Sequence, residues 1–303
     1  MTPLHLPLHV LKFGGTSLGS AERIEHVGQI VALAAGDARI VVVVSAMGGV
    51  TSDLVEATRL AAEGDEAYLA VLDRIIKAHD EPLAELPSEQ DREQVRAAYQ
   101  VWSEELEDRL HGISLVRECT ARTLDTVLAF GELVSSMLLA SVLRKSGLDA
   151  DACDARRLVV TDDAFGGARV DRESTAERFR GHFAATDTLQ VVTGFIAANP
   201  GGETTTLGRG GSDYTAALLG ADLPADRLEI WTDVDGVMSA DPRLVPDAFP
   251  LPKLSYDELM ELSHFGAKVV HPRSVHPARE RGIPLFIRNT FNLDCEGTLV
   301  SED

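Results

Sequence analysis

Short apolar runs rich in Val, Ile and Leu recur along the chain, and each ends in small or polar residues. Nearly continuous apolarity over so few residues is typical of strands that are buried on both faces, as in a parallel sheet covered by helices. We therefore predict a mainly parallel sheet. Its predicted strands are Leu8–Phe13, Ile40–Ser45, Leu189–Thr193, Leu228–Trp231 and Ile283–Ile287.

Helical periodicity fills most of the chain between these runs. Strands that alternate with helices predict an α/β architecture with right-handed crossovers. The predicted helices are Ser20–Ala35, Thr51–Ala62, Glu66–Asp80, Ser88–His111, Thr120–Ser146, Glu173–Ala185, Asp213–Leu219, Ser255–Phe265 and His276–Arg281.

Two segments depart from this alternation. Residues from about 63 to 111 are highly charged and helical, with no strand between them. We interpret them as a helical insertion that lies over the sheet, and the sequence assigns it no chemistry. The run Asn199–Glu203 (NPGGE) predicts a hairpin or loop tip because Pro and Gly favour turns.

Composition places the chain among ordinary soluble globular proteins, with 45% hydrophobic and 25% charged residues in 303. Its 48 acidic and 28 basic residues give a net charge of −20. General nucleic-acid binding and docking on anionic lipid are disfavoured, because both need clustered Lys and Arg. The acidity is also what a solubilising surface would show. A cation inside a Gly-rich motif is therefore the more informative signal.

The cysteines and the N-terminal segment bear on the compartment. Cys119, Cys153 and Cys295 are widely spaced and form no CxxC pair, which favours reduced thiols over a disulfide framework or a metal site. The start MTPLHLPLHVLKFGG has no basic region followed by an apolar run, and no segment approaches about 18 uninterrupted apolar residues. We predict a cytoplasmic protein that does not span a membrane.

The first chemical motif, KFGGTS, stands at the end of the first predicted strand. Gly14 and Gly15 let the backbone approach a ligand closely, and their N–H groups could form an anion-binding nest. Ser17 or Ser20 could cap the next helix, and Lys12 could reach the same crevice as a cation. An ordinary strand-to-helix turn with an incidental lysine explains the pattern equally well.

Two of three further motifs follow strands, where open α/β sheets bind ligands, and the third follows a predicted helix. The weak motif SAMGGVTS (Ser45–Ser52) contains Thr51, which could also be a helix N-cap. The motif WTDVDGVMSADPR (Trp231–Arg243) suits a ribose or an adenine edge better than calcium, because the Glu and the spacing of a calcium loop are missing. A solvated loop is the alternative. In FGAKVVHP, Gly-Ala-Lys offers a cation for phosphate, and His271 and His276 are better explained as structural.

The most informative stretch is TTTLGRGGSDY (Thr204–Tyr214). Glycines flank Arg209, whose guanidinium can bind a carboxylate with two hydrogen bonds. Asp213 follows in the first turn of a predicted helix, where the helix dipole favours an acidic group. A turn needed for geometry alone would not require Arg and Asp among Ser and Thr. We therefore interpret it as part of a functional site.

Taken together and in this order, the motifs resemble the aspartokinase branch of the amino acid kinase family. The resemblance spans residues 9 to 299 and is carried by KFGGTS, FGE (Phe130–Glu132), VTGF (Val191–Phe195), TTTLGRGGSDYTA, WTDVDGVMSADPR, FGAKVVHP and RNTF. The wording WTDVDGVMSADPRLVPDA is most similar to the kinase domains of bifunctional aspartokinase–homoserine dehydrogenases. The resemblance implies a three-layer αβα sandwich with a mainly parallel central sheet, the amino acid kinase fold.

The resemblance also implies an activity. It is transfer of the ATP γ-phosphate to the β-carboxylate of L-aspartate, the entry step toward lysine, threonine and methionine. Lys12 and Asp213 are the implied catalytic residues: Lys12 stabilises the phosphoryl group, and Asp213 organises Lys12. Arg209 clamps the substrate α-carboxylate and Glu132 holds its ammonium group. The other residues implied on the aspartate side are Thr51, Phe195 and Ser212.

For the nucleotide, the resemblance implies ATP, with Mg²⁺ bridging its phosphates and no metal ligands from the chain. Met238 stands where many family members have an aromatic residue, and its thioether can still pack on adenine. The residues implied on the nucleotide side are Gly14, Gly15, Thr16, Ser17, Gly210, Gly211, Thr232, Asp233, Met238, Arg243 and Lys268.

Domain organisation and partners follow from the same resemblance. We expect a single catalytic domain over 1–303, with an aspartate-side lobe (1–195) and a nucleotide-side lobe (196–303). The chain stops at GTLVSED without the ACT domains that family members carry. We therefore expect no inhibition by lysine or threonine through this chain. A homodimer is expected, with a separate regulatory or downstream enzyme subunit as a further partner. A catalytically lapsed regulatory subunit and a kinase for another amino acid are the alternatives.

Overall fold

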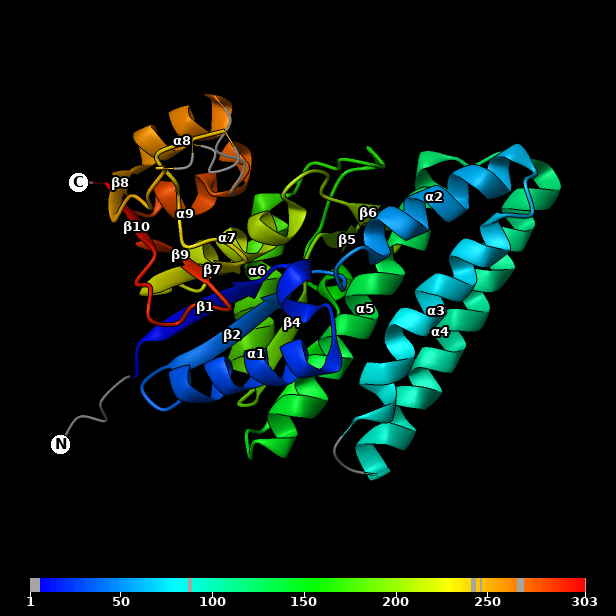
Figure 1. The fold of residues 1–303 in the computed structure, drawn as a ribbon, viewed down its shortest axis with the longest axis horizontal. Helices are drawn as coiled ribbons and strands as arrows, with labels where there is room; N and C mark the ends of the chain where they lie inside the picture. Colours follow the sequence, from blue (N-terminus) through cyan, green and yellow to red (C-terminus); the bar gives the residue numbers. More distant parts are fainter. Residues whose placement is uncertain (1–5, 87–88, 241–243, 246, 266–269, 303) are drawn as a thin grey trace.

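A mainly parallel sheet runs through the middle of the molecule (Figure 1). The computed structural model describes residues 6–86, 89–240, 244–245, 247–265 and 270–302. Within them, eight strands form one sheet in the order β3-β4-β2-β1-β7-β9-β10-β8. These strands are β1 (Leu8–Phe13), β2 (Arg39–Val44), β3 (Ala150–Cys153), β4 (Leu189–Thr193), β7 (Arg227–Thr232), β8 (Lys253–Ser255), β9 (Leu285–Asn289) and β10 (Thr298–Ser301).

Strand β1 is central and pairs in parallel with β2 on one side and β7 on the other. The sheet stays parallel from β3 to β9, and β10 then pairs with β9 in the antiparallel sense. All five predicted strands are confirmed. Those that were not predicted, β3, β8 and β10 among them, have at most four residues. A run that short carries little hydrophobic pattern.

The hairpin predicted around Asn199–Glu203 is also confirmed. Strand β5 (Ile196–Ala198) pairs with β6 (Thr204–Thr206) in a separate antiparallel sheet. The residues of NPGGE connect the two strands, and the Gly202 N–H donates to the Asn199 carbonyl across a distance of 2.9 Å. This hairpin joins the end of β4 to the segment GRGGSD.

All nine predicted helices are present, with boundaries shifted by a few residues. The long apolar helix is α5, and α1 lies beside it on the same face of the sheet. The helices are α1 (Ala21–Ala34), α2 (Val50–Glu63), α3 (Tyr68–Ala84), α4 (Glu89–Val116), α5 (Ala121–Lys145), α6 (Arg172–Ala184), α7 (Gly211–Asp222), α8 (Tyr256–Phe265) and α9 (His276–Glu280).

Alternate residues of the central strands enter two different cores, one on each face of the sheet. Val42 and Val44 of β2 pack with α1 and α5 on one face. Val41 and Val43 pack on the other face, with α6, α7 and α9. This arrangement of helix, sheet and helix confirms the predicted three-layer α/β sandwich with a mainly parallel sheet.

Helix α5 is the one helix in the described residues that is long and apolar enough to cross a membrane. However, 89% of its most apolar window is buried inside the protein. Its residues from Val127 to Leu143 are almost all buried, some of them against the sheet and others against further helices. Burial of this extent is typical of a core helix, and the apolar composition is explained by it.

The charged helical insertion is confirmed as helices α3 and α4, but its predicted place over the sheet is wrong. The two helices pack chiefly against α2 and α5, and so form a further layer outside the helices that cover the sheet (Figure 1). Leu72 and Ile75 of α3 and Leu106 and Leu110 of α4 join the same core as α5. The reason is that α5 is apolar on nearly every side and must be covered twice.

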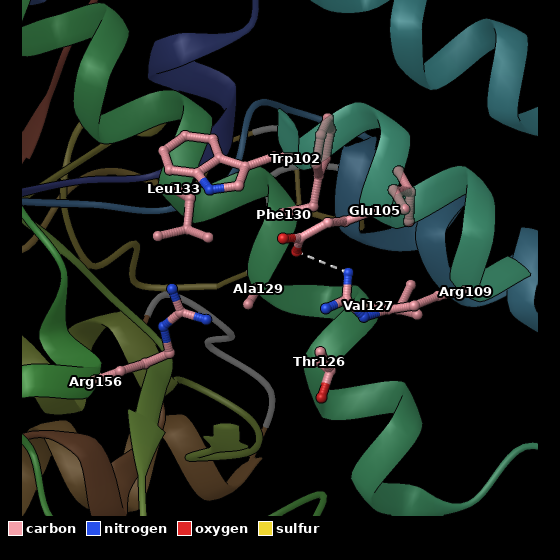
Figure 2. A pocket seen from close by; sticks show the side chains of 10 residues that line it. Trp102, Glu105, Arg109, Thr126, Val127, Ala129, Phe130, Leu133 and Arg156 are labelled. Carbon is pink, nitrogen blue, oxygen red and sulfur yellow. Dashed lines mark hydrogen bonds and ion pairs between the residues drawn. The ribbon is translucent and has the colours of Figure 1, made fainter. Parts of the chain in front are cut away.

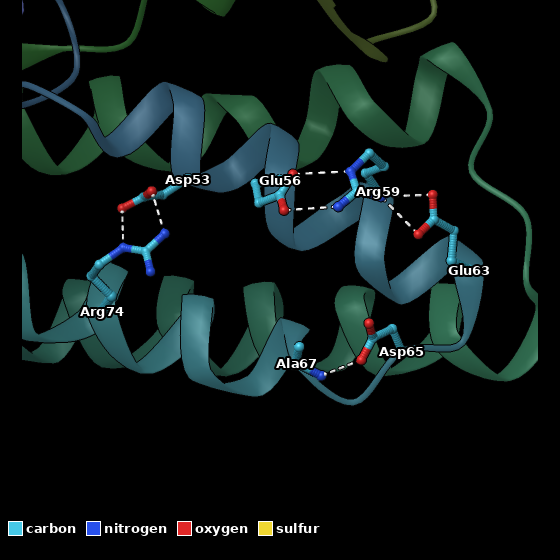
Figure 3. A network of polar contacts seen from close by, with 7 residues as sticks. All are labelled: Asp53, Glu56, Arg59, Glu63, Asp65, Ala67 and Arg74. Atoms are coloured by element: carbon cyan, nitrogen blue, oxygen red, sulfur yellow. Dashed lines mark hydrogen bonds and ion pairs between the residues drawn. The ribbon is translucent and has the colours of Figure 1, made fainter.

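Ion pairs on the outer surface accompany this packing (Figure 3). Arg74 of α3 donates two hydrogen bonds to the carboxylate of Asp53 on α2, at 2.6 and 2.9 Å. Along α2 itself, Arg59 donates to both Glu56 and Glu63. Most of these groups are exposed to solvent. They decorate the insertion and do not form part of its core.

Candidate active site

The carboxyl ends of β1, β2 and β4 meet at one edge of the sheet, and the start of α7 lies beside them. Parallel strands place the segments that follow them at the same edge, where α/β proteins bind ligands. Phe13 of β1 is in register with Val44 of β2, and Val44 with Thr193 of β4. The motifs that follow these strands therefore converge, although they are far apart in the sequence.

A buried ion pair marks the centre of this edge. The Nζ atom of Lys12 lies 2.7 Å from Oδ1 of Asp213, and each side chain is 11% exposed. Asp213 is in the first turn of α7, as predicted, where the helix dipole stabilises its negative charge. Among the described residues, Asp213 Oδ1 has no hydrogen-bond donor apart from this ionic contact. The ion pair thereby holds Lys12 at the carboxyl end of β1 and balances its charge.

A cavity of about 250 Å³ lies next to this pair. It brings together residues from five segments that the sequence places between positions 12 and 213. Four of the five residues predicted on the aspartate side line it. Ser45 and Gly208 also line it, and neither was predicted as a site residue. The lining residues are Lys12, Ser45, Thr51, Glu132, Phe195, Gly208, Gly210, Gly211, Ser212 and Asp213.

Glu132 contributes a buried carboxyl group to the cavity. It is 2% exposed, and its Oε2 atom has no hydrogen-bond partner in the described structure. Burial raises the pKa of Glu132 to about 8, and a hydrogen bond from the Ala46 backbone offsets part of this rise. An acidic group that faces a cavity with an open oxygen is suited to a cationic ligand, since an ammonium group would supply the missing donor.

Thr51 is near the start of α2 and is not its N-cap. The N-cap is Gly49, which adopts the left-handed conformation with φ of 89° and makes no side-chain capping bond. The structural alternative for Thr51 is therefore wrong. Its partly exposed hydroxyl side chain lines the cavity instead.

Phe195 has a strained backbone, with φ of 66° in the left-handed region that favours glycine. Close packing holds it there. A Cβ atom added at Gly211 would lie 2.7 Å from the Phe195 ring. The Leu207 N–H also donates to the Phe195 carbonyl at 2.9 Å. The ring is thus fixed between β5 and the glycine turn that precedes α7.

Arg209 is the predicted aspartate-side residue that does not line this cavity. Its side chain is exposed and lines a neighbouring cavity of about 600 Å³, together with Arg169 and Arg273. Gly208 lines both cavities, and Gly208 and Gly210 on either side of the arginine both have φ of 72°. The turn therefore carries the guanidinium group at the border between the two cavities.

The KFGGTS segment departs from prediction in one respect. The Gly14 N–H already donates to the Trp231 carbonyl at 3.0 Å, so the predicted anion-binding role of this amide is wrong for the structure described. Gly15 is closely packed, since a Cβ atom there would lie 2.7 Å from the Ala46 carbonyl oxygen. Ser17 shares a buried hydrogen bond of 2.7 Å with Thr290, whereas Thr16 is exposed. Ser20, the other capping candidate, caps α1.

The residues predicted on the nucleotide side are less completely assembled. Thr232 ends β7 beside β1, and its hydroxyl donates to the exposed carboxylate of Asp233 at 3.2 Å. Met238 is half-buried and forms an isolated bridge with Pro250. Arg243 and Lys268 lie outside the described residues.

Asp235 supports this loop and was not predicted. Its Oδ1 atom accepts hydrogen bonds from the amides of Asn289 and Asn292, at 2.7 and 3.0 Å. The bonds tie the WTDVDG loop to the segment that follows β9. The two asparagines belong to the RNTFN run, so a signal was present in the sequence, but their pairing with Asp235 depends on the fold.

Comparison with known proteins agrees with this geometry. Residues 7–289 match the sequence model of the amino acid kinase family. The chain belongs to that family.

Several curated relatives of the chain are aspartokinases. The chain is 39% identical over 307 residues to a chloroplastic bifunctional aspartokinase/homoserine dehydrogenase of Daucus carota, covering 99% of this chain and 33% of that protein. It is 35% identical to the chloroplastic aspartokinase 1 of Arabidopsis thaliana, covering 97% of this chain and 52% of that protein. The chain thus spans between a third and about half of the length of these relatives.

A solved structure is similar along nearly the whole chain. Aspartokinase III of E. coli, in complex with aspartate and ADP, superposes with a TM-score of 0.90 at 34% identity. The match covers 98% of this chain and 65% of that one. The resemblance seen in the sequence motifs is confirmed.

A smaller pocket of this amino acid kinase lies between α4 and α5 and contains none of the predicted site residues (Figure 2). Its volume is about 50 Å³, and Trp102, Phe130 and Leu133 form much of its wall. Glu105 and Arg109 pair with each other across 3.0 Å at its edge. Arg156 also lines the pocket and pairs with Asp154, so each of these charges has a partner and the pocket offers little free charge.

Metal binding by the chain alone has no support in the part that the structure describes. No three His, Cys, Asp or Glu side chains there converge closely enough to hold an ion. The cysteines Cys119, Cys153 and Cys295 are free.

Proposed function

We propose that the protein is an aspartate kinase, which transfers the ATP γ-phosphate to the β-carboxylate of L-aspartate to give 4-phospho-L-aspartate. The main support is the buried carboxyl group of Glu132, which has one oxygen without a partner in the described structure. This group faces the same cavity as the Lys12–Asp213 ion pair. An acidic amino acid has both an ammonium group for Glu132 and an anionic side chain for Lys12. The aspartokinase relatives support this choice of substrate.

In this proposal the aspartate side of the cavity holds both charged ends of the substrate. Glu132 receives the ammonium group, with the hydroxyls of Thr51 and Ser212 beside it. Arg209 turns inward about the glycines that flank it and binds the α-carboxylate with two hydrogen bonds. Phe195 closes the wall of the cavity. The side-chain carboxylate then points toward Lys12.

The chemical step needs little from the protein apart from position and charge. The β-carboxylate attacks the γ-phosphorus already ionised, so one P–O bond forms, another breaks, ADP leaves, and no general base is required. Lys12 stabilises the charge on the phosphoryl group in transit. Asp213 keeps the Lys12 ammonium in place through the 2.7 Å ion pair.

The phosphate donor is proposed to be ATP. The turn of Gly210 and Gly211 at the start of α7 suits its phosphates, because helix N-termini favour anions. Gly15, Thr16, Ser17, Thr232, Asp233 and Met238 complete the proposed nucleotide side, with Arg243 and Lys268 as its predicted cations. Mg²⁺ would be held by the nucleotide phosphates, since this ion prefers phosphate and carboxylate oxygens as ligands.

The remaining assignments stay predictions. They comprise the homodimer, a separate regulatory or downstream subunit, and the cytoplasmic location. The division into lobes at residue 195 is likewise a proposal. The cavity draws on both proposed lobes, because Lys12 and Glu132 precede this boundary and Ser212 and Asp213 follow it.

A hydroxylamine trap for the acyl phosphate tests the substrate directly. The purified chain is incubated with ATP, Mg²⁺ and aspartate, glutamate or acetylglutamate, and the hydroxamate is measured. We expect hydroxamate with aspartate and little with the other two. Turnover with another amino acid and none with aspartate would refute the proposal, and no turnover with any would favour a regulatory subunit.

Substitution of Arg209 tests the carboxylate clamp. Arg209→Ala should raise the aspartate KM by about 100-fold or more, since the bidentate partner of a carboxylate is lost. ATP binding should persist. Arg169→Ala is the matched control, because Arg169 is an exposed arginine of the same neighbouring cavity with no proposed role. An unchanged aspartate KM in Arg209→Ala, or an equal rise in both variants, would contradict the clamp.

A further inference from the structure

A second buried carboxylate of α5, that of Asp125, contacts the segments around the glycine turn. Asp125 is completely buried, at 0% exposure. Its Oδ1 atom accepts a hydrogen bond from the Thr206 hydroxyl at 2.7 Å. Its Oδ2 atom accepts from the backbone N–H groups of Thr206 and Gly166, at 3.0 and 2.9 Å. Both oxygens are therefore satisfied inside the protein.

Asp125 and Glu132 are seven residues apart on α5, which is nearly two helical turns. The two carboxylates therefore lie on the same side of one rigid helix. Glu132 faces the cavity, while Asp125 is joined to the hairpin and the loop beside it. Because both carboxylates belong to this helix, the helix sets the distance between them.

The partners of Asp125 lead directly to Arg209. Thr206 ends β6 and is two residues before Gly208. Gly166 belongs to a loop packed on the turn, since a Cβ atom added at Gly208 would lie 3.6 Å from the Gly166 carbonyl oxygen. The Ala168 N–H also donates to the Thr206 carbonyl at 2.8 Å. One carboxylate therefore holds α5, β6 and this loop together.

The choice of an acidic residue here is costly unless its position matters. A fully buried carboxylate loses its hydration, and three donors must replace the water. Hydrogen bonds to a charged acceptor are shorter and stronger than neutral ones. An apolar residue would fill the same space at lower cost, but it would leave two backbone N–H groups without acceptors.

We propose that Asp125 is a positioning residue for substrate binding: it holds the Gly208–Gly210 turn at a set distance from Glu132. The proposal rests on the proposed function, because it treats Arg209 and Glu132 as the groups that bind the two ends of the amino acid. Asp125 does not touch the substrate. Its effect on substrate binding is indirect, through the position of Arg209.

The first test is Asp125→Asn, which keeps the size of the side chain and replaces one acceptor oxygen by a donor amide. The amide has no negative charge and only one acceptor atom, so the hydrogen bonds from Thr206 and Gly166 weaken and the turn should shift. We expect the aspartate KM to rise about tenfold or more, because small displacements of a binding group carry large penalties. The ATP KM should change little.

Asp222→Asn is the matched control for loss of a buried carboxylate. Asp222 is also buried, at the far end of α7, and its ionic partner Arg172 lies 3.6 Å away. We expect this variant to unfold at a lower temperature without a selective change in the aspartate KM. Equal losses of thermal stability with no rise of KM in either variant would show that Asp125 is only structural.

A second variant covers the case in which Asp125→Asn does not fold. Thr206→Val removes the hydroxyl donor and leaves both backbone bonds to Asp125 intact. We expect a rise in the aspartate KM of about two- to fivefold, in line with loss of one hydrogen bond. An unchanged KM in a folded Thr206→Val protein would overturn the proposal.

Hydrogen exchange separates this proposal from the proposed function. Asp125→Asn should speed exchange of the peptides that cover residues 163–168 and 204–211, relative to the wild type and to Asp222→Asn. This readout needs no substrate. If the wild type does not phosphorylate aspartate but exchange still rises in both peptides of Asp125→Asn, the proposed function is refuted and the positioning of the turn by Asp125 is supported. Unchanged exchange in Asp125→Asn would refute this positioning role.

Discussion

The charges of α2 and α3 and the carboxylates of α5 show two opposite uses of ionic groups. On α2, Arg59 pairs with Glu56 and Glu63, and all three side chains are close to half exposed. On α5, Asp125 and Glu132 are 0% and 2% exposed. The exposed groups on α2 can exchange their ionic partners for water. The buried carboxylates on α5 can bond only to donors of the protein or of a ligand.

This difference decides what each group can do. Solvent screens the outer pairs, so their loss changes little. A buried carboxylate must find donors in the protein or bind a ligand. Asp125 has three donors, whereas Glu132 retains an oxygen without a partner in the described structure. Substitutions in the two regions should therefore differ widely in their effects.

Removal of the Lys12 charge should have the largest effect. Lys12→Met is expected to lower kcat by about 100- to 1000-fold, the usual cost of losing one group that stabilises transition-state charge. Steady-state kinetics measure it, and circular dichroism verifies folding, since Asp213 loses its partner. Lys77→Met is the control, because Lys77 also pairs with an aspartate but is exposed. Equal kcat values in the two variants would exclude a catalytic role for Lys12.

Glu132→Gln should raise the aspartate KM by about 10- to 100-fold, because the ammonium group loses its charged acceptor. The KM should also depend on pH in the wild type. The pKa of Glu132 is about 8, and a bound ammonium group favours the ionised form. Aspartate should therefore bind more tightly as the pH rises to about 8. A wild-type pH profile that Glu132→Gln leaves unaltered would contradict this role.

Thermal unfolding without substrate tests the same group independently. The folded state keeps a proton on Glu132 that the unfolded chain releases above its usual pKa of 4.5. The contribution of Glu132 to stability is therefore fully present below pH 4.5 and is lost as the pH rises to about 8. Glu132→Gln should remove this part of the pH dependence. Identical slopes of Tm against pH in both proteins would refute the raised pKa.

The smallest effect is expected on the outer surface. Arg59→Ala removes the pairs with Glu56 and Glu63 at once, yet should leave kcat and both KM values unchanged. The midpoint of thermal unfolding should move by no more than about 2 °C, as is usual for exposed substitutions. A shift as large as that of Asp125→Asn would remove the contrast between the two regions.

Prediction from the sequence succeeded where a pattern is long or chemically unusual. The valine run of β2 and the apolar helix α5 were placed correctly because their patterns extend over many residues. The family resemblance implied Thr51, Glu132, Phe195 and Ser212, and these four lie around one cavity. Motifs that follow parallel strands must meet at one edge of the sheet, so convergence was foreseeable.

Prediction from the sequence was less successful for features that depend on which segments pack together in the fold. The insertion of α3 and α4 was placed over the sheet, whereas it covers α5 and α2, since hydrophobic periodicity shows that a face is buried but not against what. The Gly14 amide was predicted to be open to an anion and is bonded to Trp231. Asp125 carried no motif signal of its own.

By itself, the sequence determined the α/β class, the main strands and helices, and the residue types that any site here must use. Those depend on local propensity and periodicity, which short segments carry. Only the tertiary structure decided which polar groups are buried and whether their partners are already present. It left Glu132 with an open oxygen, gave Asp125 three donors and placed Arg209 beside a second cavity. Desolvation and hydrogen bonding depend on every segment that packs around a group, and no stretch of sequence contains that information alone.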